Sequence, residues 1–383
     1  MPRFIFFACI LFTQISAIAQ TPVKVAVFVP LYVDSAFTNN TYKLGNTTLP
    51  KYMLSGLEFY NGVQLAIDSL KAEGKSIEVL IYDSKSSNSI ESICNQPAFE
   101  NVSLMIAQFN NRSEVKPLAD IAFKKQIPLI SATFPNDGGV TDNPFFVLLN
   151  TGLKTHIDEI YKYAQKYYAT SNIIYIRKKG ALENMLFSYF NSATKNTAAI
   201  PLKYKIIELN DGFTQDQITA VIDSNRKNTL ICGSLDESFG LQLVKTLSGL
   251  KSYQSTVIGM PTWDNIKELD RSDIKAVTTI YTTSFWYRNI APLYNYIQKK
   301  YKQKLFVKPS EWVLKGFECM YHFGSIAITN PTDCINHLSD KKFTCFNDFN
   351  IQPIKNSTAP TTIKYLENQQ LYFIKKLDGL VIQ

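Results

Sequence analysis

The chain has 383 residues, of which 45% are hydrophobic and 13% aromatic, and this composition excludes a disordered protein. The formal charge of +8 comes from scattered lysine pairs, such as Lys124 with Lys125 and Lys299 with Lys300, so no basic stripe indicates a nucleic-acid partner. A chain of this length exceeds the size at which one hydrophobic core usually keeps growing. We therefore expect two lobes.

The first residues have the pattern of an export signal. Arg3 provides a basic start, residues 4–15 form an apolar run, and Ala17 and Ala19 supply the small residues that signal peptidase requires. The run is shorter than the roughly 20 residues that a membrane-spanning helix needs. We expect residues 1–19 to be a signal peptide that is removed, which leaves a periplasmic or secreted protein without an integral membrane segment.

From Val23 onward, apolar runs of strand length alternate with amphipathic stretches of helix length, which is typical of parallel sheets covered by helices. In the first series, the expected strands are 23–29, 77–82, 102–107 and 127–130. The expected helices between these strands are 55–71, 89–93 and 113–125.

A loop at 133–144 and a strand at 145–149 end the first series, and the pattern then starts again. The expected strands of the second series are 172–177, 202–209, 229–232 and 256–259, and its helices are 156–168, 182–193, 214–224 and 237–247. A strand at 278–285, helices at 290–302 and 311–328, and strands or a hairpin within 361–382 follow. This order predicts an α/β fold with two doubly wound parallel-sheet lobes, joined by crossing segments and separated by a cleft.

Five cysteines follow the expected signal, namely Cys94, Cys232, Cys319, Cys334 and Cys345. Cys334 and Cys345 lie in one polar stretch and are the natural pair for a local disulfide in an oxidising compartment. The odd number leaves at least one free thiol. Cys232 and Cys319 lie in apolar runs, where a cysteine usually acts as a small buried hydrophobic residue.

Four segments carry a family resemblance: VKVAVFVPLY, the helix SGLEFYNGVQLAIDSL with Gly62, Ala66 and Asp68, IEVLIYDS, and IPLISAT followed by PFFV. In order and spacing they resemble type I periplasmic binding proteins, which include the leucine/isoleucine/valine-binding proteins of ABC transporters. The resemblance implies that the chain crosses between the lobes three times. It places residues 21–148 and 286–340 in lobe one and residues 149–285 and 341–383 in lobe two. It also implies closure about a hinge around a ligand, and an ABC permease as partner.

Candidate ligand-binding residues follow from the rule that ligands bind beyond the carboxyl ends of the strands in wound sheets. In lobe one the rule selects Tyr32, Gln108, Asn110, Ser131 and Thr133. In lobe two it selects Asp236, Glu237, Trp263 and Tyr281. The resemblance implies that Ser131 and Thr133 hold a carboxylate and that Asp236 or Glu237 holds an ammonium group.

Each assignment has a structural alternative. Ser131 would serve in a turn, Asp236 and Glu237 would be acids in the first turn of a helix, and Tyr32 or Trp263 would complete a core. The loop at 108–111 also departs from the family, because it carries amides where relatives have glycine and hydroxyl groups. A polar insertion at 34–53 lies at the expected cleft mouth, where it would narrow the cleft or contact a partner.

Catalytic signatures are missing from the sequence, including the nucleophile elbow, the phosphate-binding loop and the zinc motif His-Glu-x-x-His. The three histidines lack metal-ligand spacing. We therefore expect no enzyme activity, no cofactor and no metal. The predicted function is an exported solute-binding protein that closes around a small polar ligand, with an amino acid as one candidate, for ABC-type uptake or sensing. The alternative is a cell-envelope scaffold or regulatory partner that uses the same fold without a transport ligand.

Overall fold

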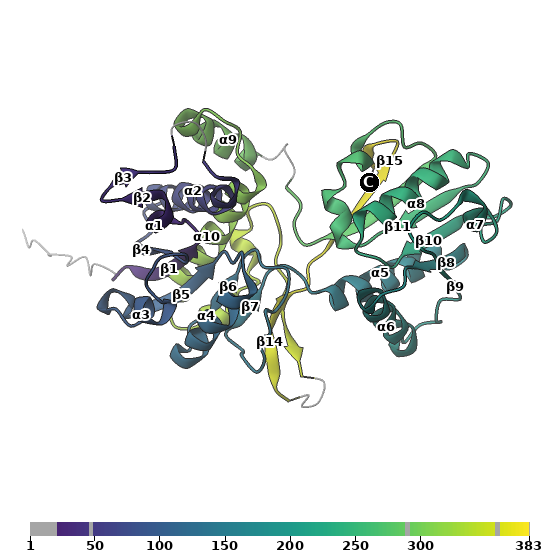
Figure 1. Cartoon of the computed structure of the whole chain (residues 1–383). Coiled ribbons are helices and arrows are strands. Elements are labelled where there is room, and N and C mark those ends of the chain that lie inside the picture. Colours follow the sequence, from purple (N-terminus) through teal and green to yellow (C-terminus); the bar gives the residue numbers. More distant parts are fainter. Residues whose placement is uncertain (1–20, 46–48, 288–291, 357–360, 383) are drawn as a thin grey trace, which may run out of the picture.

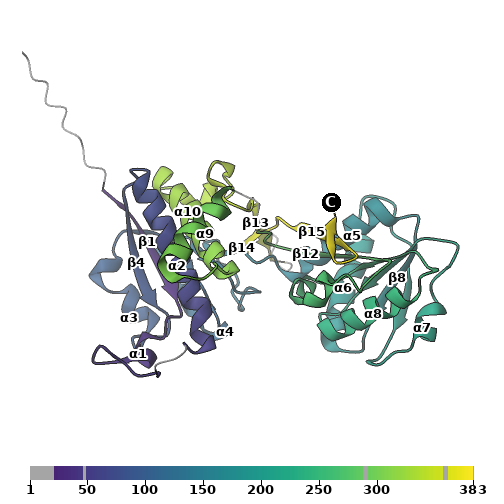
Figure 2. The same ribbon diagram turned by 90° about the horizontal axis from the view of Figure 1, so that it is seen from above.

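The computed structural model describes residues 21–382, apart from 46–48, 288–291 and 357–360 (Figure 1). The expected signal peptide, residues 1–19, lies outside the described residues. The chain forms two α/β lobes, each with a seven-stranded sheet that is mostly parallel. Figure 2 shows the two lobes side by side, with the crossing segments between them.

The first sheet has the strand order β13-β14-β7-β6-β5-β1-β4, and β13 is its one antiparallel member among the described strands. Its strands are β1 (Val23–Val29), β4 (Ile77–Asp83), β5 (Val102–Ala107), β6 (Leu129–Ser131), β7 (Phe146–Leu148), β13 (Ile351–Lys355) and β14 (Ile363–Asn368). Alternation along β1 sends Val25 and Val27 into one core and Ala26 and Phe28 into the other. Both faces are therefore covered, which explains the continuous apolar run in the sequence.

The helices of the first lobe cover both faces of its sheet. They are α1 (Val33–Ala36), α2 (Lys51–Ala72), α3 (Ile90–Cys94), α4 (Arg112–Lys125), α9 (Pro292–Leu305) and α10 (Glu311–Thr329). Short 3-10 turns at Pro97–Phe99, Cys334–His337 and Lys341–Phe343 complete it. Helix α2 begins at Lys51, earlier than expected, with Pro50 as its N-cap residue. The insertion at 34–53 also holds a small hairpin of β2 (Phe37–Thr38) and β3 (Thr41–Tyr42).

The second sheet has the order β16-β15-β12-β11-β10-β8-β9, with β15 antiparallel to both of its neighbours. Its strands are β8 (Asn172–Arg177), β9 (Lys205–Glu208), β10 (Asn228–Cys232), β11 (Ser255–Ile258), β12 (Val277–Thr283), β15 (Tyr372–Leu377) and β16 (Leu380–Ile382). Its helices are α5 (Leu153–Tyr168), α6 (Ala181–Asn196), α7 (Gln215–Thr219) and α8 (Glu237–Gly249), with 3-10 turns at Pro261–Asn265 and Lys267–Asp270. No helix in the described part of the chain has both the length and the apolar character needed to cross a membrane.

The chain crosses between the sheets after β7, after β12 and between β14 and β15. The third crossing comes after Asn368, later than the expected lobe boundary at residue 340. Strand β14 pairs in parallel with β7, and β13 pairs with β14, so both strands extend the first sheet. The stretch 351–368 therefore lies with the first lobe, although the sequence analysis assigned 341–383 to the second lobe. Only β15 and β16 carry the expected terminal strands into the second sheet.

Candidate functional site

The three crossings are joined by hydrogen bonds between buried groups. The Thr151 N–H donates to Ser284 Oγ over 3.0 Å, which joins the first crossing to the second. The Thr151 hydroxyl donates to the Asn368 carbonyl over 2.7 Å, which joins the first crossing to the third. Asn368 Nδ2 in turn donates to the Leu149 carbonyl over 3.3 Å. These bonds fix the crossings beside one another and define a hinge.

A buried carboxylate on α10 holds two segments of the hinge region against the first lobe. Glu318 accepts hydrogen bonds from the N–H groups of Phe346 (3.0 Å) and Asn347 (2.7 Å). It also accepts from Asn347 Nδ2 (2.9 Å) and from the Tyr287 hydroxyl (3.0 Å). Burial raises the pKa of Glu318, although its hydrogen bonds act in the opposite direction. Asn347 Oδ1 also accepts a hydrogen bond from the backbone N–H of Trp286. One side-chain cluster therefore anchors both segments, 286–287 and 346–347.

A cleft of about 1410 Å³ lies at the hinge and is lined by both lobes. This volume exceeds the roughly 300–1,000 Å³ of a typical small-molecule pocket, as expected for lobes that stand apart. The first lobe contributes Thr133, Asn136, Asp137, Glu311, Lys315, Tyr365 and Glu367, among others. The second lobe contributes Lys154, His156, Met185, Tyr189, Pro261 and Asp264, among others. The lining is thus rich in groups that hydrogen-bond a polar ligand.

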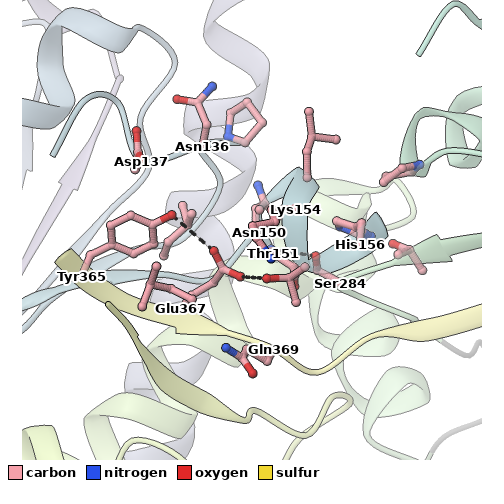
Figure 3. A pocket seen from close by; sticks show the side chains of 18 of the residues that line it. Asn136, Asp137, Asn150, Thr151, Lys154, His156, Ser284, Tyr365, Glu367 and Gln369 are labelled. Atoms are coloured by element: carbon pink, nitrogen blue, oxygen red, sulfur yellow. Dashed lines mark hydrogen bonds between the residues drawn. The ribbon is translucent and has the colours of Figure 1, made fainter. Parts of the chain in front are cut away.

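Glu367 on β14 connects the two lobes within this cleft (Figure 3). Its side chain is only 2% exposed, and its carboxylate accepts a hydrogen bond of 2.6 Å from the Thr155 hydroxyl on α5. The Tyr365 hydroxyl donates to it over 3.5 Å, and the Gly152 N–H also donates. Burial raises the pKa of Glu367. The N-terminus of α5 is the positive end of its helix dipole and favours a carboxylate there. A side chain of the first lobe therefore caps a helix of the second.

Three charged side chains lie on the cleft wall near the second crossing. Lys315 Nζ lies 4.0 Å from the centroid of the Phe285 ring, a cation–π contact. Burial lowers the pKa of Lys315, while the nearby carboxylates of Glu311 and Asp264 oppose this shift. The pKa of both carboxyl groups is raised, chiefly by burial. Lys315 and Glu311 belong to the first lobe and Asp264 to the second, so the cluster spans the cleft. Asp264 also accepts a bond of 3.4 Å from Thr283 Oγ1.

Of the candidates predicted in lobe one, Thr133 lines the cleft, and its hydroxyl donates to the Phe109 carbonyl over 3.3 Å. The others lie at carboxyl ends of strands, as the rule required, but outside the cleft lining. Asn110 Nδ2 donates to the Tyr32 hydroxyl over 2.9 Å, so these two residues are together. Gln108 and Ser131 are buried at the ends of β5 and β6.

The candidates predicted in lobe two have structural partners. Asp236 caps α8 by accepting from the N–H groups of Ser238 and Phe239, and it forms an ion pair of 2.7 Å with Lys178. These contacts lower the pKa of Asp236. Glu237 lies in the first turn of α8 and accepts a bond of 3.2 Å from Asn265. Both acids therefore fit the helix-terminus alternative.

Trp263 and Tyr281 belong to the core of the second lobe, which fits the structural alternative given for Trp263. The Trp263 side chain is fully buried, and its ring lies against Gly240 and Gly259, where an added Cβ would clash with it. Tyr281 packs in the same core from β12. Both rings therefore stabilise the core of the lobe, and the Tyr281 side chain also hydrogen-bonds to Asp264 on the cleft wall.

Sequence reasoning missed several cleft residues. Asn150 lies two residues after the end of β7 and donates to the carbonyls of Thr133 and Phe134 over 2.6 and 3.1 Å. Its position at a strand end could have identified it. Glu367 was missed because β14 had been assigned to the wrong sheet, and Lys315 because it lies on a helix that reads as buried on nearly all sides.

The expected disulfide between Cys334 and Cys345 is not present, because both residues are free thiols. Cys334 packs into the first lobe's core, whereas the Cys345 sulfur lies 3.7 Å from the Phe343 carbonyl. Burial raises the pKa of the Cys334 thiol to about 12, so it is a protonated, unreactive group.

His156 lines the cleft but is buried, and its Nδ1 lies 2.8 Å from Thr282 Oγ1. Burial lowers the pKa of His156 to about 3, so the ring is neutral at ordinary pH. Within the described ranges, no group of three or more His, Cys, Asp or Glu residues is arranged to hold a metal ion. The contact between the His156 ring and Thr282 of β12 is therefore structural.

Comparison with solved structures identifies the fold. A protein of Rhodospirillum rubrum described as a branched-chain amino acid ABC transporter has a TM-score of 0.67 at 11% identity, covering 94% of this chain and 99% of that one. A similarly described protein of Silicibacter pomeroyi has a TM-score of 0.56 at 13% identity, covering 94% and 96%. LpoA of Haemophilus influenzae has a TM-score of 0.56 at 11% identity, and the match spans 95% of this chain but 59% of LpoA.

No protein-family model and no curated protein sequence matches the chain. The likeness is therefore one of architecture. In this chain the architecture consists of two wound lobes, three crossings and a cleft at the hinge. This chain has the fold of the type I periplasmic binding proteins.

Proposed function

We propose that the chain is an exported solute-binding protein that closes its lobes around a small polar ligand, for ABC-type uptake or sensing. The observation that carries the proposal is the cleft of about 1410 Å³, lined by polar groups of both lobes beside the hinge. A ligand that contacts both lobes stabilises the closed state, since only that state provides all of its contacts. An amino acid is one candidate, because Lys315 and Asp264 lie on the cleft wall with opposite charges.

The proposal includes an ABC permease as partner and the periplasm as location. It also includes the absence of catalysis. The neutral His156 does not suit a general base, whose pKa should lie near the working pH. The acids of the cleft serve binding and structure, as the hydrogen bonds of Glu367 illustrate.

The test is a thermal-shift screen of the full-length mature chain with amino acids, small carboxylates, sugars and peptidoglycan fragments. At about 100 times its dissociation constant, a ligand adds about 2.7 kcal/mol of stability, which corresponds to a rise of several degrees. Small-angle scattering should then report a smaller radius of gyration as the lobes close. A ligand that raises the melting temperature without compaction would contradict closure.

A second candidate function is an envelope scaffold without a transport ligand. Exposed aromatic rings on the insertion favour this function. Phe37 and Tyr42 of the small hairpin are both exposed, and their rings pack edge to face with centroids 5.6 Å apart. Exposed apolar groups of this kind often serve protein contacts. No thermal response across the whole panel would favour this second function.

A further inference from the structure

Three consecutive apolar residues are exposed where helix α9 ends. Leu305 is the last residue of α9, and Phe306 and Val307 follow it. Their exposed fractions are 37%, 85% and 55%. A run of exposed apolar residues is unfavourable in water unless it serves a contact. We call these three residues the apolar tip; α9, which carries it, lies at the upper margin of the first lobe in Figure 1.

The backbone holds Phe306 in this exposed position. Its φ of 61° lies in the left-handed region, which a bulky residue seldom adopts. The Phe306 N–H donates to the Lys302 carbonyl over 2.9 Å, so Phe306 occupies the position after a helix end where glycine or asparagine is usual. A phenylalanine at this position is strained and gains no burial within the lobe. Strain and exposure at one residue indicate a contact outside the chain.

The segment that carries the tip is basic and has no acid to balance it. Residues 292–310 contain no aspartate or glutamate but five lysines, namely Lys299, Lys300, Lys302, Lys304 and Lys308. All five are exposed. Among the residues that the structure describes, none of them forms an ion pair. The apolar tip is therefore flanked by positive charge that is free to meet an anionic partner.

The opposite face of α9 fixes the helix to the first lobe. Ile297 and Tyr301 are buried in the core that α2 and α10 also enter. After the tip, the Ser310 hydroxyl donates to the Glu58 carboxylate on α2 over 2.7 Å. The cleft lining includes no residue of 292–310. The tip and its lysines thus form a fixed, outward surface that is separate from the ligand cleft.

We propose that the apolar tip and the five lysines dock the first lobe on the surface of an anionic phospholipid membrane. Apolar side chains enter the boundary between headgroups and acyl chains, while lysine ammonium groups are attracted to the lipid phosphates. A nucleic acid or an acidic protein surface would satisfy the lysines but would leave the protruding Phe306 ring in water. A lipid surface satisfies both, because it yields around the ring. The inference goes beyond the proposed function, since it does not depend on which solute the cleft binds.

The experiment is co-sedimentation of the full-length mature chain with vesicles of phosphatidylcholine alone or of phosphatidylcholine mixed with phosphatidylglycerol. The parent chain should bind the anionic vesicles more tightly, and added salt should weaken this binding because it screens the charges. Phe306→Asn should weaken binding to the anionic vesicles about tenfold. Asparagine suits the left-handed backbone, so this variant should not lose thermal stability.

Further variants separate the ring from the charge. Phe306→Trp, which keeps an aromatic side chain suited to the membrane interface, should bind as the parent does. Replacing Lys304 and Lys308 by glutamine should weaken binding about fivefold for each lysine removed. The matched control is Phe123→Gln, which removes a 51% exposed phenylalanine beside Lys124 and Lys125 on α4 of the same lobe and should leave binding unchanged.

Three results would overturn the proposal. The first is equal binding to neutral and anionic vesicles, or binding to neither. The second is unchanged binding by Phe306→Asn, since the lysines alone would then account for the attraction. The third is binding to double-stranded DNA as tight as binding to the anionic vesicles and equally insensitive to Phe306→Asn, which would assign the lysines to a nucleic acid instead.

Discussion

A glycine on α10 controls how closely this helix approaches α2, and its replacement should destabilise the first lobe. A Cβ added to Gly316 would lie 2.1 Å from the Phe59 carbonyl oxygen, and one added to Gly62 would lie 2.0 Å from the Val313 carbonyl oxygen. Since real Cβ atoms essentially never come within 3.0 Å, Gly316→Ala must separate the helices by about 1 Å. Overpacking of this kind typically destabilises by about 1–3 kcal/mol, and more where backbone must move.

The assay is thermal unfolding, where each kcal/mol lowers the melting temperature by about 2–4 °C for a unit of this size. The control is Gly249→Ala at the end of α8, where an added Cβ meets nothing within 4 Å and the change should be neutral or slightly stabilising. Because α10 also carries Glu318, Gly316→Ala should loosen the hinge as well. A Gly316→Ala chain as stable as the control would refute the close-packing argument.

The remaining predictions concern buried carboxylates and a helix cap. Glu318→Ala leaves the Asn347 N–H and other buried donors unpaired, and each unpaired donor costs about 1–3 kcal/mol, so urea unfolding should show a clear loss of stability; a loss below about 1 kcal/mol would contradict the anchor. The pKa of Glu367 is raised, so at this group the folded chain binds more protons than the unfolded chain. The stability that Glu367 contributes therefore falls as the pH rises above the ordinary pKa of a glutamate. The melting-temperature advantage of the parent over Glu367→Gln should therefore shrink from pH 4.5 to 7, and a growing advantage would reverse the sign. Asp236→Ala removes the cap of α8 and should lower the free energy of unfolding by about 1 kcal/mol, as measured by calorimetry. A variant of unchanged stability with weaker ligand binding would instead support a binding role for Asp236.

Much of the fold is predictable because the central strands are buried on both faces. Runs such as 23–29 and 102–107 are apolar at nearly every position, and helical stretches separate them, so the βα alternation is explicit in the sequence. The strand-end rule likewise placed Tyr32 and Asn110 together, and the structure joins them by a hydrogen bond.

The hinge was not predictable in the same way, because its contacts depend on which sheet receives each late strand. The sequence of β14, IKYLEN, would suit a strand near the edge of either sheet, and its pairing with β7 decides where Glu367 lies. The roles of Trp263 and Asp236 depend on tertiary partners far along the chain, such as Lys178, which no local pattern specifies.

The arrangement of the hinge also indicates where the lobes bend. Glu318 attaches residues 286–287 and 346–347 firmly to the first lobe, so these segments should move with it. We therefore expect bending at 150–152, at Ser284 and at 369–371, the parts of the three crossings that lie outside this anchor. Glu367 sits across this boundary through Thr155, and a rotation about the hinge must either carry that bond along or break it. Because the bond joins a hydroxyl to a carboxylate near the axis, where displacements are smallest, we expect it to persist through closure.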